Sequence, residues 1–166
     1  MSNEKTLKNL EAAFSGESQA NRKYLAFAKK ADAEGFHQVA MLFRAAAEAE
    51  TIHAHTHLAT MGGIGSTEEN LKAAVEGETY EFTSMYPSFI EDAAAEGQKR
   101  AERSFRLANE AEKVHAELFV KAAKEPSAGK EFDYYLCTVC GHIAEGSAPS
   151  ECPLCGAAEK AYRVVK

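Results

Sequence analysis

The sequence has no long apolar run, no excess of basic residues and no cysteine before position 137. Its apolar stretches fall far short of the roughly 20 residues that a membrane-spanning helix needs. Lys and Arg number 19 against 25 Asp and Glu, so the net charge of −6 argues against nucleic acid as a partner. The first five residues lack the basic and then apolar plan of a secretory signal. We therefore expect a cytoplasmic protein.

Proline is also scarce, since residues 4–124 contain it only at position 87. This region is rich in Ala, Glu, Lys and Leu, and its apolar residues recur at helical spacing, as in Val39, Leu42, Phe43 and Ala46. The pattern predicts four helices that pair into two hairpins, over residues 4–34, 37–61, 67–96 and 98–124. The overall apolar content of 45% is enough for a core.

The two predicted hairpins are copies of one another. Residues 9–17 recur at 70–78, and residues 34–53 recur at 96–115. Each copy contains one isolated Glu and one Glu-x-x-His, whose two side chains share a helix face. Two hairpins packed antiparallel would direct four carboxylates and two imidazoles to one centre, as in ferritin-like di-metal bundles. The six candidate ligands are Glu17, Glu50, His53, Glu78, Glu112 and His115.

Glycine and serine mark the helix ends. Gly35 and Gly97 stand where the first and third helices end, which suits a left-handed C-cap. Residues 62–65 break the pattern between the hairpins, where a ferritin-like fold needs its crossover. Residues 66–69, Ser-Thr-Glu-Glu, predict a capping box that opens the third helix.

The repeat offset changes from 61 to 62 residues within the third helix. One additional residue therefore lies between Glu78 and Tyr86, compared with the interval from Glu17 to Tyr24. A single insertion inside a helix is commonly absorbed as a π-bulge, which we expect between Glu78 and Pro87. A kink caused by Pro87 alone is the alternative.

The candidate ligands suit iron, manganese or zinc, because they combine carboxylates with imidazoles. Four carboxylates balance two divalent ions, with Glu50 and Glu112 as the natural bridges. A fifth acid, Glu81, follows Glu78 by three residues. We hypothesise that one metal takes His53 when reduced and Glu81 when oxidised, since oxidation adds positive charge.

Other polar residues near these positions have less specific interpretations. His55 and His57 lack counterparts in the second copy and are expected to be exposed, with His57 a possible neighbour of the site. Tyr24 and Tyr86 correspond between the copies. They are either hydrogen-bond donors to site carboxylates or ordinary core residues.

The cysteines form two Cys-x-x-Cys pairs, at Cys137 and Cys140 and at Cys152 and Cys155. Four thiolates at this spacing indicate a tetrahedral metal site, which zinc or iron would fill equally well on spacing alone. The neighbouring bundle favours iron, since a redox centre there needs electrons. We expect a linker at 125–131 and a small metal-held domain at 132–166. Its short strands are predicted from Phe132, Tyr134, Tyr135, Tyr162, Val164 and Val165.

These motifs together resemble the rubrerythrin family over essentially the whole chain. The resemblance implies a mostly α fold: a ferritin-like four-helix bundle over 1–124, then a rubredoxin-like domain. It also implies a di-iron centre and one rubredoxin-type iron. The seven di-iron positions of the family pattern are all present here: Glu17, Glu50, His53, Glu78, Glu81, Glu112 and His115. His142 replaces an aromatic residue that is common after the first cysteine pair.

The implied activity is a peroxidase that reduces hydrogen peroxide to water and protects against oxidative stress. Electrons would come from a reduced pyridine nucleotide through a reductase or rubredoxin, and would reach the di-iron centre through the cysteine-bound iron. Subunits of the family pair head to tail, so a homodimer or larger homo-oligomer is expected.

Three other functions compete with this interpretation. A ferritin-like iron store would have little use for a dedicated reductant domain. A structural protein with a zinc ribbon would be colourless when purified. An oxidase that consumes dioxygen is the remaining enzymatic alternative.

Overall fold

The computed structural model describes residues 4–125 and 131–165. The chain divides into two compact units, Met1–Gly65 and Ser66–Lys166. The division falls in the segment that separates the two predicted hairpins.

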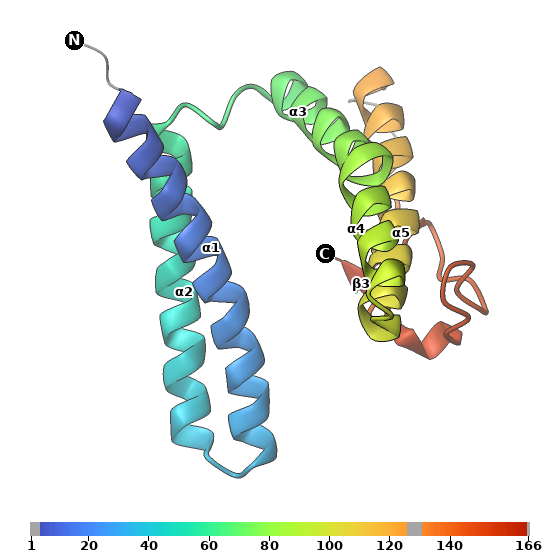
Figure 1. Ribbon diagram of the computed structural model, residues 1–166, viewed down its shortest axis with the longest axis horizontal. Helices are drawn as coiled ribbons and strands as arrows, with labels where there is room; N and C mark the ends of the chain where they lie inside the picture. The colour runs from blue at the N-terminus through green and yellow to red at the C-terminus, as the bar shows by residue number, and fades with distance from the viewer. Residues whose placement is uncertain (1–3, 126–130, 166) are drawn as a thin grey trace. The chain divides into compact units, whose positions relative to one another are not determined.

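The first unit is an antiparallel helical hairpin of α1 (Glu4–Ala33) and α2 (His37–Thr60), drawn in blue to teal in Figure 1. Gly35 turns the chain with a φ of 83°, as the sequence predicted. Ala28, Ala31 and Ala40 are buried where the helices meet, with Phe43 packed against them. Small side chains at the contact bring the two backbones close, and ligands on both helices can then reach one another.

In the second unit, three consecutive helical segments pack against one long helix (Figure 1). The segments are α3 (Thr67–Tyr80), η1 (Glu81–Met85) and α4 (Tyr86–Ala95), and the long helix is α5 (Lys99–Lys124). The predicted capping box is confirmed: the Ser66 hydroxyl accepts from the Glu69 amide, and the Glu69 carboxylate accepts from the Ser66 amide. The turn before α5 uses Gly97 at a φ of 68°.

The segment η1 is a π-helix, and its position confirms the bulge predicted from the repeat offset. The Tyr86 amide donates to the Glu81 carbonyl, five residues back. This wider turn absorbs the inserted residue. Tyr86 therefore keeps the relation to Glu78 that Tyr24 has to Glu17, although it lies one residue further along.

The C-terminal part forms a three-stranded antiparallel sheet in the order β2-β1-β3. Its strands are β1 (Tyr134–Cys137), β2 (Ile143–Glu145) and β3 (Tyr162–Val165), with a short 3₁₀ turn, η2 (Glu159–Ala161), before β3. Phe132 lies just before β1, so its predicted strand position was wrong. Most of the linker predicted at 125–131, namely residues 126–130, lies outside the described residues.

None of the helices in the described part of the chain is both long enough and apolar enough to cross a membrane.

Candidate metal centres

The first half of the predicted ligand set converges within the α1–α2 hairpin. Glu17 on α1 and Glu50 and His53 on α2 each offer a ligand atom within 4.8 Å of the others. His53 Nδ1 lies 3.0 Å from a Glu50 carboxylate oxygen. Hydrogen bonds from His53 and then Glu17 lower the pKa of Glu50. The His53 side chain is 55% exposed, so this half-site opens on one side of the hairpin.

The second half-site repeats this arrangement within the second unit. Glu78 on α3 and Glu112 and His115 on α5 offer ligand atoms within 4.8 Å of one another. His115 Nδ1 lies 2.6 Å from Glu112 and 3.7 Å from Glu78. Burial and then the neighbouring Glu112 raise the pKa of Glu78. Two carboxylates held this close repel one another without a cation, so the donor set fits a bound metal.

Matching aromatic clusters lie beside the ligands in the two copies. Tyr24, Phe27 and Phe43 form one cluster, with ring centroids 5.5–6.4 Å apart, and the rings of the equivalent cluster are 5.6–6.3 Å apart. That second cluster comprises Tyr86, Phe89 and Phe105. The pKa of Tyr86 is raised by burial and by the charges of Glu112, Glu81 and Glu78. Both tyrosines are partly buried, and Tyr86 lies within the field of the carboxylates.

The fifth acid, Glu81, is the first residue of the π-helix. Burial and the negative charge of Glu78 raise its pKa. It is therefore a partly buried carboxyl group beside the second half-site. Neither His55, which is exposed, nor His57, which is partly buried, belongs to a ligand cluster among the described residues.

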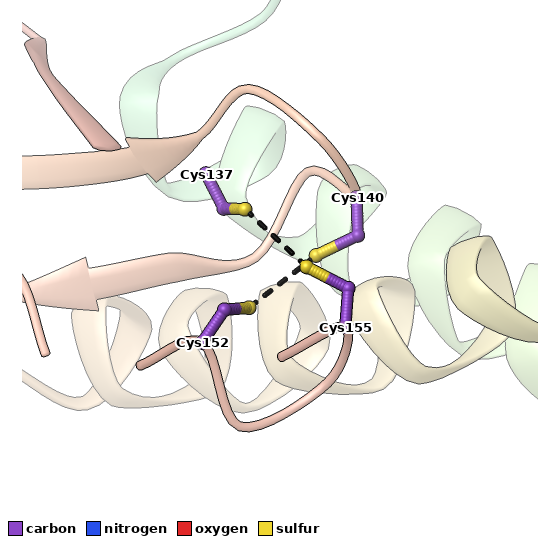
Figure 2. A group of neighbouring side chains, drawn as sticks. All are labelled: Cys137, Cys140, Cys152 and Cys155. Atoms are coloured by element: carbon purple, nitrogen blue, oxygen red, sulfur yellow. Dashed lines mark hydrogen bonds between the residues drawn. The ribbon is translucent and has the colours of Figure 1, made fainter. Parts of the chain in front are cut away.

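The four cysteines form a separate candidate metal site, shown in Figure 2. The Sγ atoms of Cys137 and Cys155 are 3.7 Å apart, and those of Cys140 and Cys152 are 3.6 Å apart. A tetrahedral ion with metal–sulfur bonds of about 2.3 Å requires sulfur–sulfur distances of about 3.8 Å. The sulfur atoms are therefore spaced as they would be around a bound tetrahedral ion. Gly141 and Gly156 follow the two pairs at positive φ, and their amides close the turns onto Cys137 and Cys152.

A tyrosine and a histidine support one side of the cysteine cage. The Tyr162 hydroxyl lies 2.8 Å from Nδ1 of the buried His142. Burial disfavours the Cys152 thiolate, but a hydrogen bond from Tyr162 and the amides of Cys155 and Leu154 lower the pKa of Cys152 to about 6. The sequence marks His142 but gives no signal for this role of Tyr162, because the role depends on the register that pairs Cys137 with Tyr162.

Within the second unit, the cysteine cage and the second half-site are linked directly. His115 Nε2 lies 2.9 Å from the carbonyl oxygen of Gly141, and Gly141 directly follows Cys140. The Lys121 ammonium on α5 pairs with Glu145 on β2, and it also lies 5.7 Å from the Phe132 ring centroid. No sequence signal connects residues 115 and 141, so this contact was not predicted.

Two family models match this chain, one over the helical region and one over the cysteine region. The family model described as Rubrerythrin matches residues 8–123, and the model described as Rubrerythrin, rubredoxin-like domain, matches residues 135–163. Nigerythrin from Nitratidesulfovibrio vulgaris is 38% identical over 90% of this chain and 81% of its own. Rubrerythrin from Porphyromonas gingivalis is 35% identical over 98% of this chain and 90% of its own. The structure titled "Fully reduced state of nigerythrin (all ferrous)" has a TM-score of 0.60 and 36% identity, and covers 96% and 86% of the two chains.

Proposed function

The chain belongs to the rubrerythrin family, and from this premise we propose that it reduces hydrogen peroxide to water with electrons relayed through its cysteine-bound iron. Membership confirms the predicted fold class, a ferritin-like helical region followed by a rubredoxin-like domain. It also confirms the two kinds of metal site, one of carboxylates and imidazoles and one of thiolates.

The observation that carries the proposal is the position of His115. Its Nδ1 faces Glu112 and Glu78, while its Nε2 meets the Gly141 carbonyl beside Cys140. One imidazole thus spans the gap between a carboxylate-rich half-site and a thiolate cage. A centre that only stored ferric iron would not need such a contact. A centre that must be re-reduced in every catalytic cycle would need a contact with its electron donor.

The reaction consumes one peroxide, two electrons and two protons, and it releases two waters. Glu17, Glu50 and His53 of one half-site, and Glu78, Glu112 and His115 of the other, would hold the two iron ions, which would supply the two electrons. The chain's own residues supply the surroundings. Glu81, whose pKa is raised by burial and by Glu78, can hold a proton on its carboxyl group next to the half-site. The Tyr86 ring lies near these carboxylates and packs on Phe105.

The electron donor is proposed by analogy with the family. Rubrerythrins are typically homo-oligomers that receive electrons from a reductase or rubredoxin, ultimately from a reduced pyridine nucleotide. The thiolate cage is the expected entry point, because its ligand Cys155 is partly exposed.

Peroxide consumption and ferric mineral growth, measured in parallel on iron-loaded protein with a chemical reductant, test the proposed function. We expect stoichiometric peroxide loss, recurring with each addition of reductant, and no mineral. Cys152→Ser should retain one rapid turnover of the pre-reduced bundle but lose sustained turnover, since its cage no longer passes electrons. Mineral growth without peroxide consumption would establish an iron store instead.

Glu81→Ala tests the proposed exchange between His53 and Glu81. Because Glu81 is needed only when the centre gains positive charge, the variant should bind ferrous iron normally but turn over peroxide about tenfold more slowly or worse. Glu76→Ala is the matched control, since Glu76 is an exposed acid of α3 that pairs only loosely with Lys72, at 3.9 Å. Unchanged turnover in Glu81→Ala would end the exchange hypothesis.

A further inference from the structure

Basic side chains gather beside the cysteine cage. A hollow of about 470 Å³ lies between the first half of α5 and the second cysteine pair, and all of its lining belongs to the second unit. The lining from α5 includes Lys99, Arg103 and Arg106, and the lining from the cysteine region is Leu154 and Cys155. Cys155 is a partly exposed ligand of the cage, labelled in Figure 2. One sulfur ligand of the metal site therefore borders a surface hollow that carries several cations.

These cations are exposed and only partly neutralised. The side chains of Lys99 and Arg106 are 83% and 59% exposed, and they share one acid, Glu102, at 3.4 and 3.0 Å. Arg103 is also exposed and forms no ion pair within residues 4–125 and 131–165. The lining thus has an excess of positive charge, although the whole chain has a net charge of −6.

The duplication of the helical region shows that the bundle itself does not require these charges. Helix α2 corresponds to α5 at an offset of 62 residues. The counterparts of Lys99 and Arg103 in α2 are His37 and Met41, which carry no fixed positive charge. The additional cations therefore occur on the copy that shares a compact unit with the cysteine cage.

A surface of this kind suits a protein partner better than a small ligand. Small-molecule sites are mostly apolar and enclose most of their ligand, whereas the basic side chains here are exposed. Electron-transfer partners form small and transient contacts, and complementary charges direct their encounter. A basic surface on an acidic chain would guide an acidic partner to this one face, where Cys155 offers the shortest route to the metal site.

We propose that Lys99, Arg103 and Arg106 form the docking surface for an acidic one-electron carrier protein, which reduces the cysteine-bound iron from the side of Cys155. In each encounter the carrier loses one electron and the ferric ion gains it, and no bond forms or breaks. Two encounters supply the electrons for one peroxide. This inference rests on the proposed function, since it names the class of partner that would re-reduce the cysteine-bound iron.

Binding measured without electron transfer tests the surface directly. Protein loaded with zinc in place of iron is titrated with an oxidised acidic rubredoxin by isothermal titration calorimetry, at low and at high salt. We expect binding that weakens as salt rises, because salt screens exposed charges. Lys99→Glu combined with Arg103→Glu should weaken binding at low salt by about tenfold or more.

The matched control is Lys23→Glu combined with Lys29→Glu. Both lysines are exposed residues of α1 in the first unit, and neither lines the hollow. The control makes the same change in net charge as the test variant. It should bind the carrier with an affinity within about twofold of that of the unaltered protein, since only charges close to the contact strongly affect docking.

Reduction of the cysteine-bound iron gives a second readout, on iron-loaded protein. Stopped-flow absorption of the ferric thiolate bands should show that reduced rubredoxin reduces the test variant about tenfold more slowly than the control. Dithionite at high salt, where surface charges are screened, should reduce both proteins at the same rate. Equal rates with dithionite would also show that the substitutions leave the cage intact.

Equal binding and equal reduction by rubredoxin in the test variant and the control would overturn the proposal. A lower mass of the test variant in solution than of the unaltered protein would also overturn it, since this face would then be an interface between copies of the chain. None of these measurements uses peroxide. Salt-dependent docking at this surface without peroxide turnover would therefore support the docking surface and count against the peroxidase.

Discussion

At the scale of single residues, the cysteine centre depends on side chains that are not ligands. His142 can donate through Nδ1 to the Tyr162 oxygen, which leaves the Tyr162 hydrogen for Cys152. This orientation follows from the chemistry of a thiolate, which accepts hydrogen bonds but cannot donate them. His142 and Tyr162 together thus direct the Tyr162 hydroxyl hydrogen towards the sulfur of Cys152.

Tyr162→Phe is expected to lower the reduction potential of the cysteine-bound iron. Hydrogen bonds to ligand sulfurs stabilise the reduced, more negative cluster, so removing one favours the ferric state. We expect about a tenfold change in the one-electron equilibrium, which corresponds to about 59 mV. A spectroelectrochemical titration measures it. Tyr134→Phe on β1 serves as the control, because the Tyr134 ring packs on Phe132. Equal potentials in the two variants would count against the role of Tyr162.

At the scale of helices, α3 and α5 hold carboxylates close together, and this arrangement lowers the stability of the fold when no metal is bound. The pKa of Glu78 is raised above its ordinary value of 4.5, first by burial and then by Glu112. A carboxyl group with a raised pKa in the folded state stabilises the fold below the ordinary pKa. That contribution is lost as the pH rises through the raised value, because the unfolded chain gives up its proton first.

The melting temperature of metal-free protein should therefore fall between pH 4.5 and pH 7, and it should fall less in Glu78→Gln. Adding a divalent metal at pH 7 should raise the melting temperature of the unaltered protein more than that of the variant, since the cation offsets the carboxylate charges. Differential scanning calorimetry measures both effects. Identical pH profiles for the two proteins would show that Glu78 does not destabilise the metal-free fold as the pH rises.

The π-helix shows how an element can be predicted from a repeat. The shift in offset located an inserted residue before Pro87, and the segment Glu81–Met85 accommodates it. Hydrogen bonding decides between the two interpretations that the sequence left open, because the Tyr86 amide reaches Glu81 rather than a residue four back.

At the scale of the whole molecule, the proposed electron transfer would depend on the contact between the cysteine domain and α5. Besides the bond from His115 to Gly141, a pair of opposite charges, Lys121 and Glu145, joins the two parts. Lys121→Glu places two negative charges in contact and should slow re-oxidation of the cysteine-bound iron by the peroxide-treated bundle severalfold.

Stopped-flow absorption of the ferric thiolate bands follows this re-oxidation. Adding Glu145→Lys to Lys121→Glu reverses both charges and should restore the rate, which a merely structural defect would not allow. A rate that is the same in all three proteins would show that this ion pair has no part in holding the domain.

The sequence by itself determined the helices, the capping box of α3 and the candidate ligands of the bundle and of the cysteine cage. These depend on local periodicity, on residue chemistry and on a duplication that puts the same ligand types at the same spacing. Tertiary structure alone decided that His115 meets Gly141 and that Tyr162 supports Cys152. Contacts of this kind join residues that are far apart in the chain and share no pattern.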